Sequence, residues 1–121
     1  MKVQLENVKP MDIEKRSFEI ITEELGYALP EKEAPIIKRC IHTSADFDYA
    51  ENLCFSEDVV EKALKALKNG ACIVTDTQMA KSGINKKALA KYGGEVYCFM
   101  SDADVAETAK KNGTTRATAS M

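Results

Sequence analysis

Two short apolar runs, each followed by a helical pattern, constrain the fold of this chain more than any other feature. They are Ala71-Cys72-Ile73-Val74 and Val96-Tyr97-Cys98-Phe99-Met100. Both runs are apolar at every position, which is typical of parallel strands that helices cover on two faces. Their alternation with helical segments predicts an α/β fold in which helices cover a parallel sheet.

Capping residues and apolar periodicity predict the remaining elements. The 121 residues form one predicted domain, 1–121, without a repeat or an internal linker. The first half of the chain begins with an expected N-terminal arm over 1–11, a helix from Asp12 to Leu25 stopped by Gly26, and a helix from Pro30 that carries His42 near its C-terminus. A strand over Leu53-Cys54-Phe55 and a helix from Ser56 to Asn69 follow. The second half is expected to contain a loop or short helix over Met79–Ile84, a helix from Asn85 to Tyr92, a helix over Asp102–Asn112 capped by Ser101, and the first turn of another helix over Ala117–Met121.

Composition excludes several classes of function. The formal net charge of −2 and the pI of about 5.5 argue against a broad nucleic-acid surface. No apolar run approaches the roughly 20 residues that span a bilayer, and the N-terminus lacks an apolar signal core, so we expect a cytoplasmic protein without membrane partners. The four cysteines form no C-x-x-C pair and are predicted to be buried, reduced thiols. A metal site of scattered cysteines with His42 is the alternative, which the missing ligand spacing disfavours.

The segment Cys40–Leu53 concentrates the polar side chains that chemistry needs. It holds His42, the only histidine, followed by Thr43 and by the carboxylate of Asp46. The unperturbed pKa of histidine lies closest to neutral pH, so its side chain suits proton transfer. At the C-terminus of a helix, the dipole would favour the protonated imidazole. The alternative is a structural histidine that is hydrogen-bonded to a nearby aspartate.

Two further segments suit ligand binding. Thr75-Asp76-Thr77 follows the first predicted strand, at the sheet edge where open α/β sheets bind ligands. Gly113-Thr114-Thr115-Arg116 combines backbone N–H groups at a helix start with hydroxyls and a guanidinium, a set that binds anions. A simple capping turn is the alternative for this second segment.

Five blocks of the sequence together resemble the precorrin-8X methylmutase family, also called cobalt-precorrin-8 methylmutases. They occur in the family's order along essentially the whole chain, which corresponds to the family's N-terminal portion. Family enzymes continue well beyond this point, so we expect a fragment, a proteolysed product or a short relative. The blocks are Ile13–Ile21, Lys38–Phe47, Gly70–Met79, Gly83-Ile84 and Gly113–Met121.

The resemblance implies a three-layer α/β/α domain, Rossmann-like, with a mostly parallel sheet, that acts as a homodimer. It implies an isomerase of cobalamin biosynthesis that moves a methyl group from C-11 to C-12 of a tetrapyrrole. The product would be hydrogenobyrinic acid or, with cobalt inserted, cobyrinic acid. No cofactor and no protein-bound metal are expected, because the shift is intramolecular and any cobalt belongs to the substrate. A tetrapyrrole-binding or dimerising module without turnover is the alternative. A nucleotide-binding Rossmann-like domain is disfavoured, because no G-x-G-x-x-G or Walker sequence is present.

The family's essential histidine matches His42, which we interpret as a general acid that protonates a ring nitrogen. Asp46 would orient the imidazole or, alternatively, cap a helix. The substrate carboxylates call for guanidinium and hydroxyl groups. Other roles remain open for four residues. Arg16 is alternatively a surface charge, and Met79 alternatively packs in the core. Phe47 and Tyr49 either stack on the macrocycle or pack in the core. The predicted substrate-binding residues are Arg16, Ser17, Thr43, Asp46, Thr75, Asp76, Thr77, Met79, Thr114, Thr115 and Arg116.

Overall fold

The computed structural model describes residues 6–121, and the start of the predicted N-terminal arm lies outside the described residues. The chain divides into two compact units, Met1–Val60 and Glu61–Met121, and each unit has its own internal packing.

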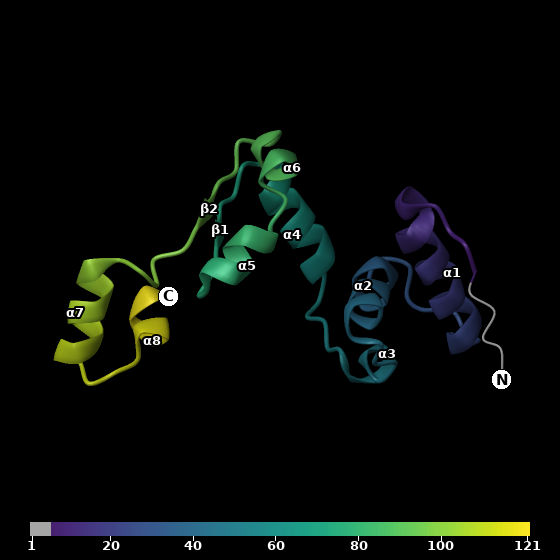
Figure 1. Cartoon of the computed structure of the whole chain (residues 1–121), viewed down its shortest axis with the longest axis horizontal. Helices are drawn as coiled ribbons and strands as arrows, with labels where there is room; N and C mark the ends of the chain where they lie inside the picture. Colours follow the sequence, from purple (N-terminus) through teal and green to yellow (C-terminus); the bar gives the residue numbers. More distant parts are fainter. Residues whose placement is uncertain (1–5) are drawn as a thin grey trace. The chain divides into compact units, whose positions relative to one another are not determined.

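The first unit consists of helices packed in chain order (Figure 1). α1 packs against α2, and α2 packs against α3. α1 ends where predicted, because Gly26 adopts the left-handed conformation with φ of 68° and its N–H donates to the Thr22 carbonyl. The elements are a 3₁₀ helix η1 (Pro10–Asp12), α1 (Ile13–Leu25), α2 (Ala34–Ser44) and α3 (Tyr49–Asn52).

Isoleucines from α1 and α2 form the core of this unit. Ile21, Ile37 and Ile41 are buried, and Ile41 is only 1% exposed. Phe18 and Phe47 are among the half-buried side chains that pack around them. This small apolar cluster fixes the two helices that carry the candidate site.

Two predictions for the first unit are wrong. α2 begins at Ala34 rather than at Pro30, which places Pro35 in the first turn. A proline is tolerated there because its missing N–H would have no intrahelical partner, whereas a helix from Pro30 would place it further inside. The segment Leu53-Cys54-Phe55 forms no strand; the side chains of Leu53 and Phe55 pack against the isoleucine core instead.

The second unit contains a parallel strand pair, which confirms the predicted α/β class and the parallel pairing. β1 and β2 lie side by side in Figure 1, and they pair with Ile73 opposite Val96 and Val74 opposite Tyr97. α7 packs against α8. The elements are α4 (Val59–Lys68), which begins in the last residues of the first unit, β1 (Ile73–Val74), α5 (Gln78–Gly83), α6 (Lys86–Ala90), β2 (Val96–Tyr97), α7 (Ala103–Lys111) and α8 (Arg116–Ser120).

The predicted burial of both strand faces is wrong. Cys98 is buried, but Val74, Tyr97 and Phe99 are each 39% exposed, and the rings of Tyr97 and Phe99 stack with centroids 6.0 Å apart. One face of the strand pair is therefore uncovered by the described residues. The two apolar runs from which the strands were predicted are apolar at every position, but only two residues of each pair with the other strand.

Helix starts in the second unit also differ from prediction. α4 begins at Val59 rather than after Ser56, because Asp58 adopts a positive φ of 56° that interrupts a helix. α7 begins at Ala103, with Asp102 rather than Ser101 at the capping position. Asn85 caps α6 as predicted, and its side chain accepts a hydrogen bond from the Ala88 N–H.

The cysteines are less buried than predicted. All four are free; Cys98 is buried and Cys40 half-buried, whereas Cys54 and Cys72 are exposed. Cys54 lies in the irregular segment after α3, and Cys72 directly precedes β1. Within residues 6–121, no helix combines the length and hydropathy that a membrane span requires.

Replacing Gly70 with alanine is expected to destabilise the second unit by roughly 1–3 kcal/mol. Gly70 has a φ of +84°, and an added Cβ would lie 2.9 Å from the Tyr92 carbonyl oxygen. Gly83→Ala is the matched control, because a Cβ there meets nothing within 4 Å. Urea unfolding followed by circular dichroism should separate the two variants, and equal midpoints would contradict this account of Gly70.

Candidate functional site

A pocket of about 600 Å³ lies in the first unit, between one face of α1 and the C-terminal end of α2. Polar groups enter it from Arg16 and Ser17 on α1 and from His42 on α2. The other lining residues are mostly apolar, with two carboxylates, Glu6 and Glu24, among them. An apolar wall with a few convergent polar groups is typical of a small-molecule site.

His42 is half-buried in the last turn of α2, where the sequence predicted it. Its Nδ1 lies 2.7 Å from the hydroxyl oxygen of Ser17. The edge of the ring meets Phe18, with centroids 5.7 Å apart and planes at 83°. Within the part of the chain that the structure describes, Nε2 has no hydrogen-bond partner, so it is the ring nitrogen left for a ligand.

Phe18 is itself held by a charged side chain. The Arg39 guanidinium carbon lies 5.1 Å from the Phe18 ring centroid, and Arg39 Nη2 donates to Glu14 Oε1 over 2.7 Å. This hydrogen bond lowers the pKa of the Glu14 carboxyl and raises the pKa of Arg39. The aromatic side chain beside His42 is thus fixed by a cation–π contact between α1 and α2.

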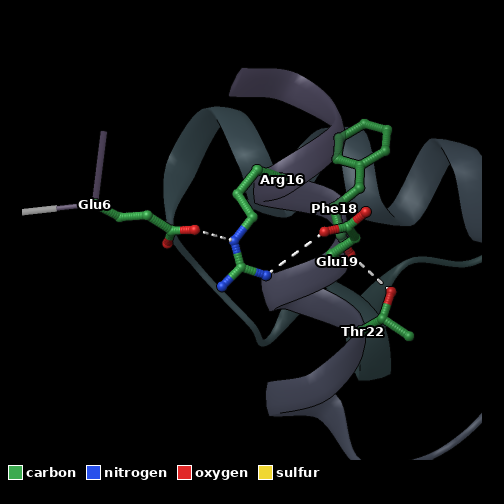
Figure 2. A network of polar contacts seen from close by, with 5 residues as sticks. All are labelled: Glu6, Arg16, Phe18, Glu19 and Thr22. Atoms are coloured by element: carbon green, nitrogen blue, oxygen red, sulfur yellow. Dashed lines mark hydrogen bonds and ion pairs between the residues drawn. The ribbon is translucent and has the colours of Figure 1, made fainter. Parts of the chain in front are cut away.

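Arg16 lies between two carboxylates, as Figure 2 shows. Its Nε donates to Glu6 Oε1 over 2.9 Å, and its Nη1 lies 3.5 Å from Glu19 Oε2. The hydrogen bond to Glu6 raises the pKa of the guanidinium. With a side chain 34% exposed, Arg16 is a paired group on the pocket wall rather than a free surface charge.

Two predicted residues near His42 do not line this pocket. The Thr43 hydroxyl donates to the carbonyls of Arg39 and Cys40 on its own helix. Asp46 Oδ1 accepts a hydrogen bond from the Asp48 N–H over 3.0 Å, directly before α3. The described contacts of Asp46 are therefore local: its carboxylate closes a turn before α3 and does not cap that helix, whose capping residue is Asp48. The observed partner of the imidazole is a serine.

The residues after β1 make mostly local contacts. Thr75 is buried and its hydroxyl donates to the Thr77 carbonyl over 3.0 Å. Thr77 caps α5 by accepting from the Ala80 N–H. Asp76 is exposed. Met79 is 84% exposed, so the core-packing alternative for it is wrong.

The turn before α8 has the geometry of a cap. The Thr115 side chain accepts from the Thr118 N–H over 3.1 Å. The Thr114 N–H donates to the Ala109 carbonyl on α7. Arg116 is exposed at the first position of α8. The capping alternative is confirmed for Thr115, while the binding of an anion by Arg116 stays a prediction.

Within the described part of the first unit, the structure thus brings together three of the predicted site residues, Arg16, Ser17 and His42. Sequence reasoning missed the pairing of Ser17 with His42, although Ser17 falls among the apolar positions of α1 and so on its inward face. It also missed Phe18 and Arg39 as neighbours of the imidazole. Among residues 6–121, no group of three or more acidic, cysteine or histidine side chains is placed to hold a metal ion.

Comparison with known proteins gives one consistent family. The family model described as precorrin-8X methylmutase matches residues 12–121. A cobalt-precorrin-8 methylmutase of Priestia megaterium is 44% identical over 94% of this chain and 51% of its own length. One of Salmonella typhimurium is 45% identical over 93% of this chain and 57% of its own length.

Solved structures give the same result. The structure of a precorrin-8X methyl mutase from Thermus thermophilus aligns with a TM-score of 0.78 and 38% identity, over 91% of this chain and 53% of that one. The chain therefore spans about half the length of the relatives that it matches.

Proposed function

Because the chain belongs to the precorrin-8X methylmutase family, we propose that it carries the acid-bearing part of an isomerase of cobalamin biosynthesis. The proposed reaction moves a methyl group from C-11 to C-12 of precorrin-8X or cobalt-precorrin-8. The product is hydrogenobyrinic acid or cobyrinic acid. The matching relatives are named for this methyl shift, which supports an isomerase rather than a nucleotide-binding domain.

The observation that carries this proposal is the pocket of the first unit. Its apolar walls suit the face of a macrocycle, and the Arg16 guanidinium suits one of the carboxylates around the ring. His42 presents Nε2 without a protein partner among the described residues. One pocket thus offers a proton donor, a guanidinium that can bind a substrate carboxylate, and apolar contact area for the ring.

His42 is the proposed general acid. The imidazolium gives a proton to a ring nitrogen of the tetrapyrrole, which makes the π-system electron-poor and lowers the barrier to the methyl shift. The carbon–methyl bond at C-11 breaks as the bond at C-12 forms. The ring nitrogen then returns its proton to His42, so the reaction needs no other reactant.

Binding requires Arg16 to exchange partners. In the free chain its guanidinium pairs with Glu6, whose side chain is 59% exposed. An exposed ion pair contributes little to stability, because water and salt screen it, so a substrate carboxylate can replace Glu6 at little cost.

The predicted residues of the second unit remain candidates for substrate contact in their own right. Arg116 with Thr114 and Thr115 would bind substrate carboxylates, and Thr75–Thr77 with Met79 would contact the substrate at the end of β1. A homodimer and a cytoplasmic location complete the proposal.

Titration with the product corrinoid tests the binding half of the proposal. The purified chain is expected to shift the visible absorbance of the corrinoid, and Arg16→Ala is expected to weaken binding about tenfold or more, the scale of a lost charge-assisted hydrogen bond. Lys110→Ala, on the exposed face of α7, is the control. Equal affinities for Arg16→Ala and wild type would contradict the role of the pocket.

Turnover separates an isomerase from a binding module. The chain is incubated with precorrin-8X, and formation of hydrogenobyrinic acid is followed by absorbance. Binding without product would favour the non-catalytic alternative for this chain.

A further inference from the structure

We propose that Ser17 positions His42, by donating a hydrogen bond to Nδ1 so that neutral His42 carries its proton on Nε2. This inference concerns the tautomer and orientation of one ring, and only its kinetic consequence rests on the proposed function. In this role Ser17 acts through His42 rather than on the substrate.

The assignment of the donor follows from counting protons. The Ser17 hydroxyl and His42 Nδ1 are 2.7 Å apart in a half-buried setting. If Nδ1 carried the proton, the serine O–H would need another acceptor, and the structure gives it none within residues 6–121. If Ser17 donates instead, one bond satisfies both its own hydrogen and the lone pair of Nδ1. An unmade hydrogen bond in a half-buried site costs free energy, which favours the second arrangement.

Two neighbouring side chains of α1 then set the orientation of the ring. Ser17 holds Nδ1, and Phe18 meets the ring edge at 83° with centroids 5.7 Å apart. Phe18 is in turn held by Arg39 on α2. Rotation of the imidazole would break the serine bond and the aromatic contact together, so Nε2 stays the available nitrogen.

A hydroxyl is suited to an acid that gives a proton and takes it back. With resting, neutral His42, Ser17 donates to Nδ1. In the imidazolium, and in the Nδ1–H imidazole that remains after Nε2 has given its proton to the substrate, Nδ1–H donates and the serine oxygen accepts. The bond survives all three states, because a hydroxyl can reverse its role where a carboxylate cannot. Asp46, which the sequence suggested for this place, bonds instead to the Asp48 N–H.

Nitrogen-15 NMR of the imidazole tests the tautomer without any substrate. The chain is labelled and prepared without a histidine tag, so that His42 is its only imidazole. At about pH 9, above the ordinary titration range of histidine, wild type is expected to show Nδ1 as an acceptor nitrogen and Nε2 as the protonated one. Ser17→Ala is expected to move Nδ1 toward the averaged shift of exchanging tautomers, and Ser17→Thr to retain the wild-type pattern.

The control is Ser82→Ala, which removes a hydroxyl that bonds only to its own helix. A protonated Nδ1 in wild type, or a folded Ser17→Ala protein with an unchanged nitrogen spectrum, would overturn the proposal. In turnover, Ser17→Ala is expected to lower kcat/KM about 10- to 100-fold, the scale of a misoriented catalytic group, with recovery in Ser17→Thr. The NMR result stands without turnover, so an inactive wild-type chain with the expected tautomer would count against the proposed function and not against the role of Ser17.

Discussion

Replacing His42 with alanine is expected to lower turnover of precorrin-8X by about 10²–10⁴-fold, the usual contribution of a general acid. The alanine removes the only imidazole of the chain and the ring nitrogen that the pocket offers to a ligand. Binding should change far less than turnover, because the apolar walls and Arg16 remain. Single-turnover kinetics together with corrinoid titration measure the two effects separately.

Two further variants sharpen this experiment. His42→Asn keeps a polar side chain of similar size without a transferable proton, and it should be as slow as the alanine variant. Glu51→Ala removes an exposed carboxylate from α3 and should retain wild-type turnover. If either His42 variant kept turnover within about tenfold of wild type, His42 would not be the acid. A general acid contributes a rate enhancement of at least about 10²-fold.

Replacing Ile41 with alanine is expected to destabilise the first unit by about 2–5 kcal/mol. Ile41 is 1% exposed and packs with Ile21 and Ile37 in the small core between α1 and α2. A loss of this size approaches the total stability of a small domain, which is about 5–15 kcal/mol. Urea unfolding followed by helical circular dichroism should show an early loss of signal from this unit.

The same helix supplies the control for this second experiment. Ile36 lies on α2 but is 42% exposed, so Ile36→Ala should cost less than about 1 kcal/mol. If both variants unfolded at the same urea concentration, the placement of Ile41 in the core would be wrong. Ile41 directly precedes His42, so the Ile41 variant should also lose corrinoid binding as the pocket walls separate.

Features set by neighbouring residues were predictable from the sequence. Gly26 ends α1, and the side chains of Asn85 and Thr115 cap the helices that follow them. Each of these depends on a hydrogen bond or a backbone conformation within a few residues. The pattern around them is therefore enough to locate these helix ends. The starts of α2, α4 and α7 differ from the prediction, so local capping signals do not fix every boundary.

The strands were less predictable, because a strand exists only where a partner pairs with it. Leu53-Cys54-Phe55 is as apolar as a strand, yet it pairs with no strand among the described residues and lies on a helical core. The runs around β1 and β2 do pair, but Val74 and Tyr97 lie on the face that the described residues leave uncovered. Apolar character alone could not distinguish a strand from core packing, nor a covered face from an open one.

The sequence by itself determined the family and the α/β class, and it made His42 the candidate acid, because the family motifs and the only imidazole can be read along the chain. Only the tertiary structure decided which side chain orients that imidazole. Asp46 is near His42 in sequence, whereas Ser17 is 25 residues away and reaches Nδ1 because α1 packs against α2. Sequence proximity favoured the aspartate, but burial of the isoleucine core fixes the two helices in a register that brings the serine to the ring.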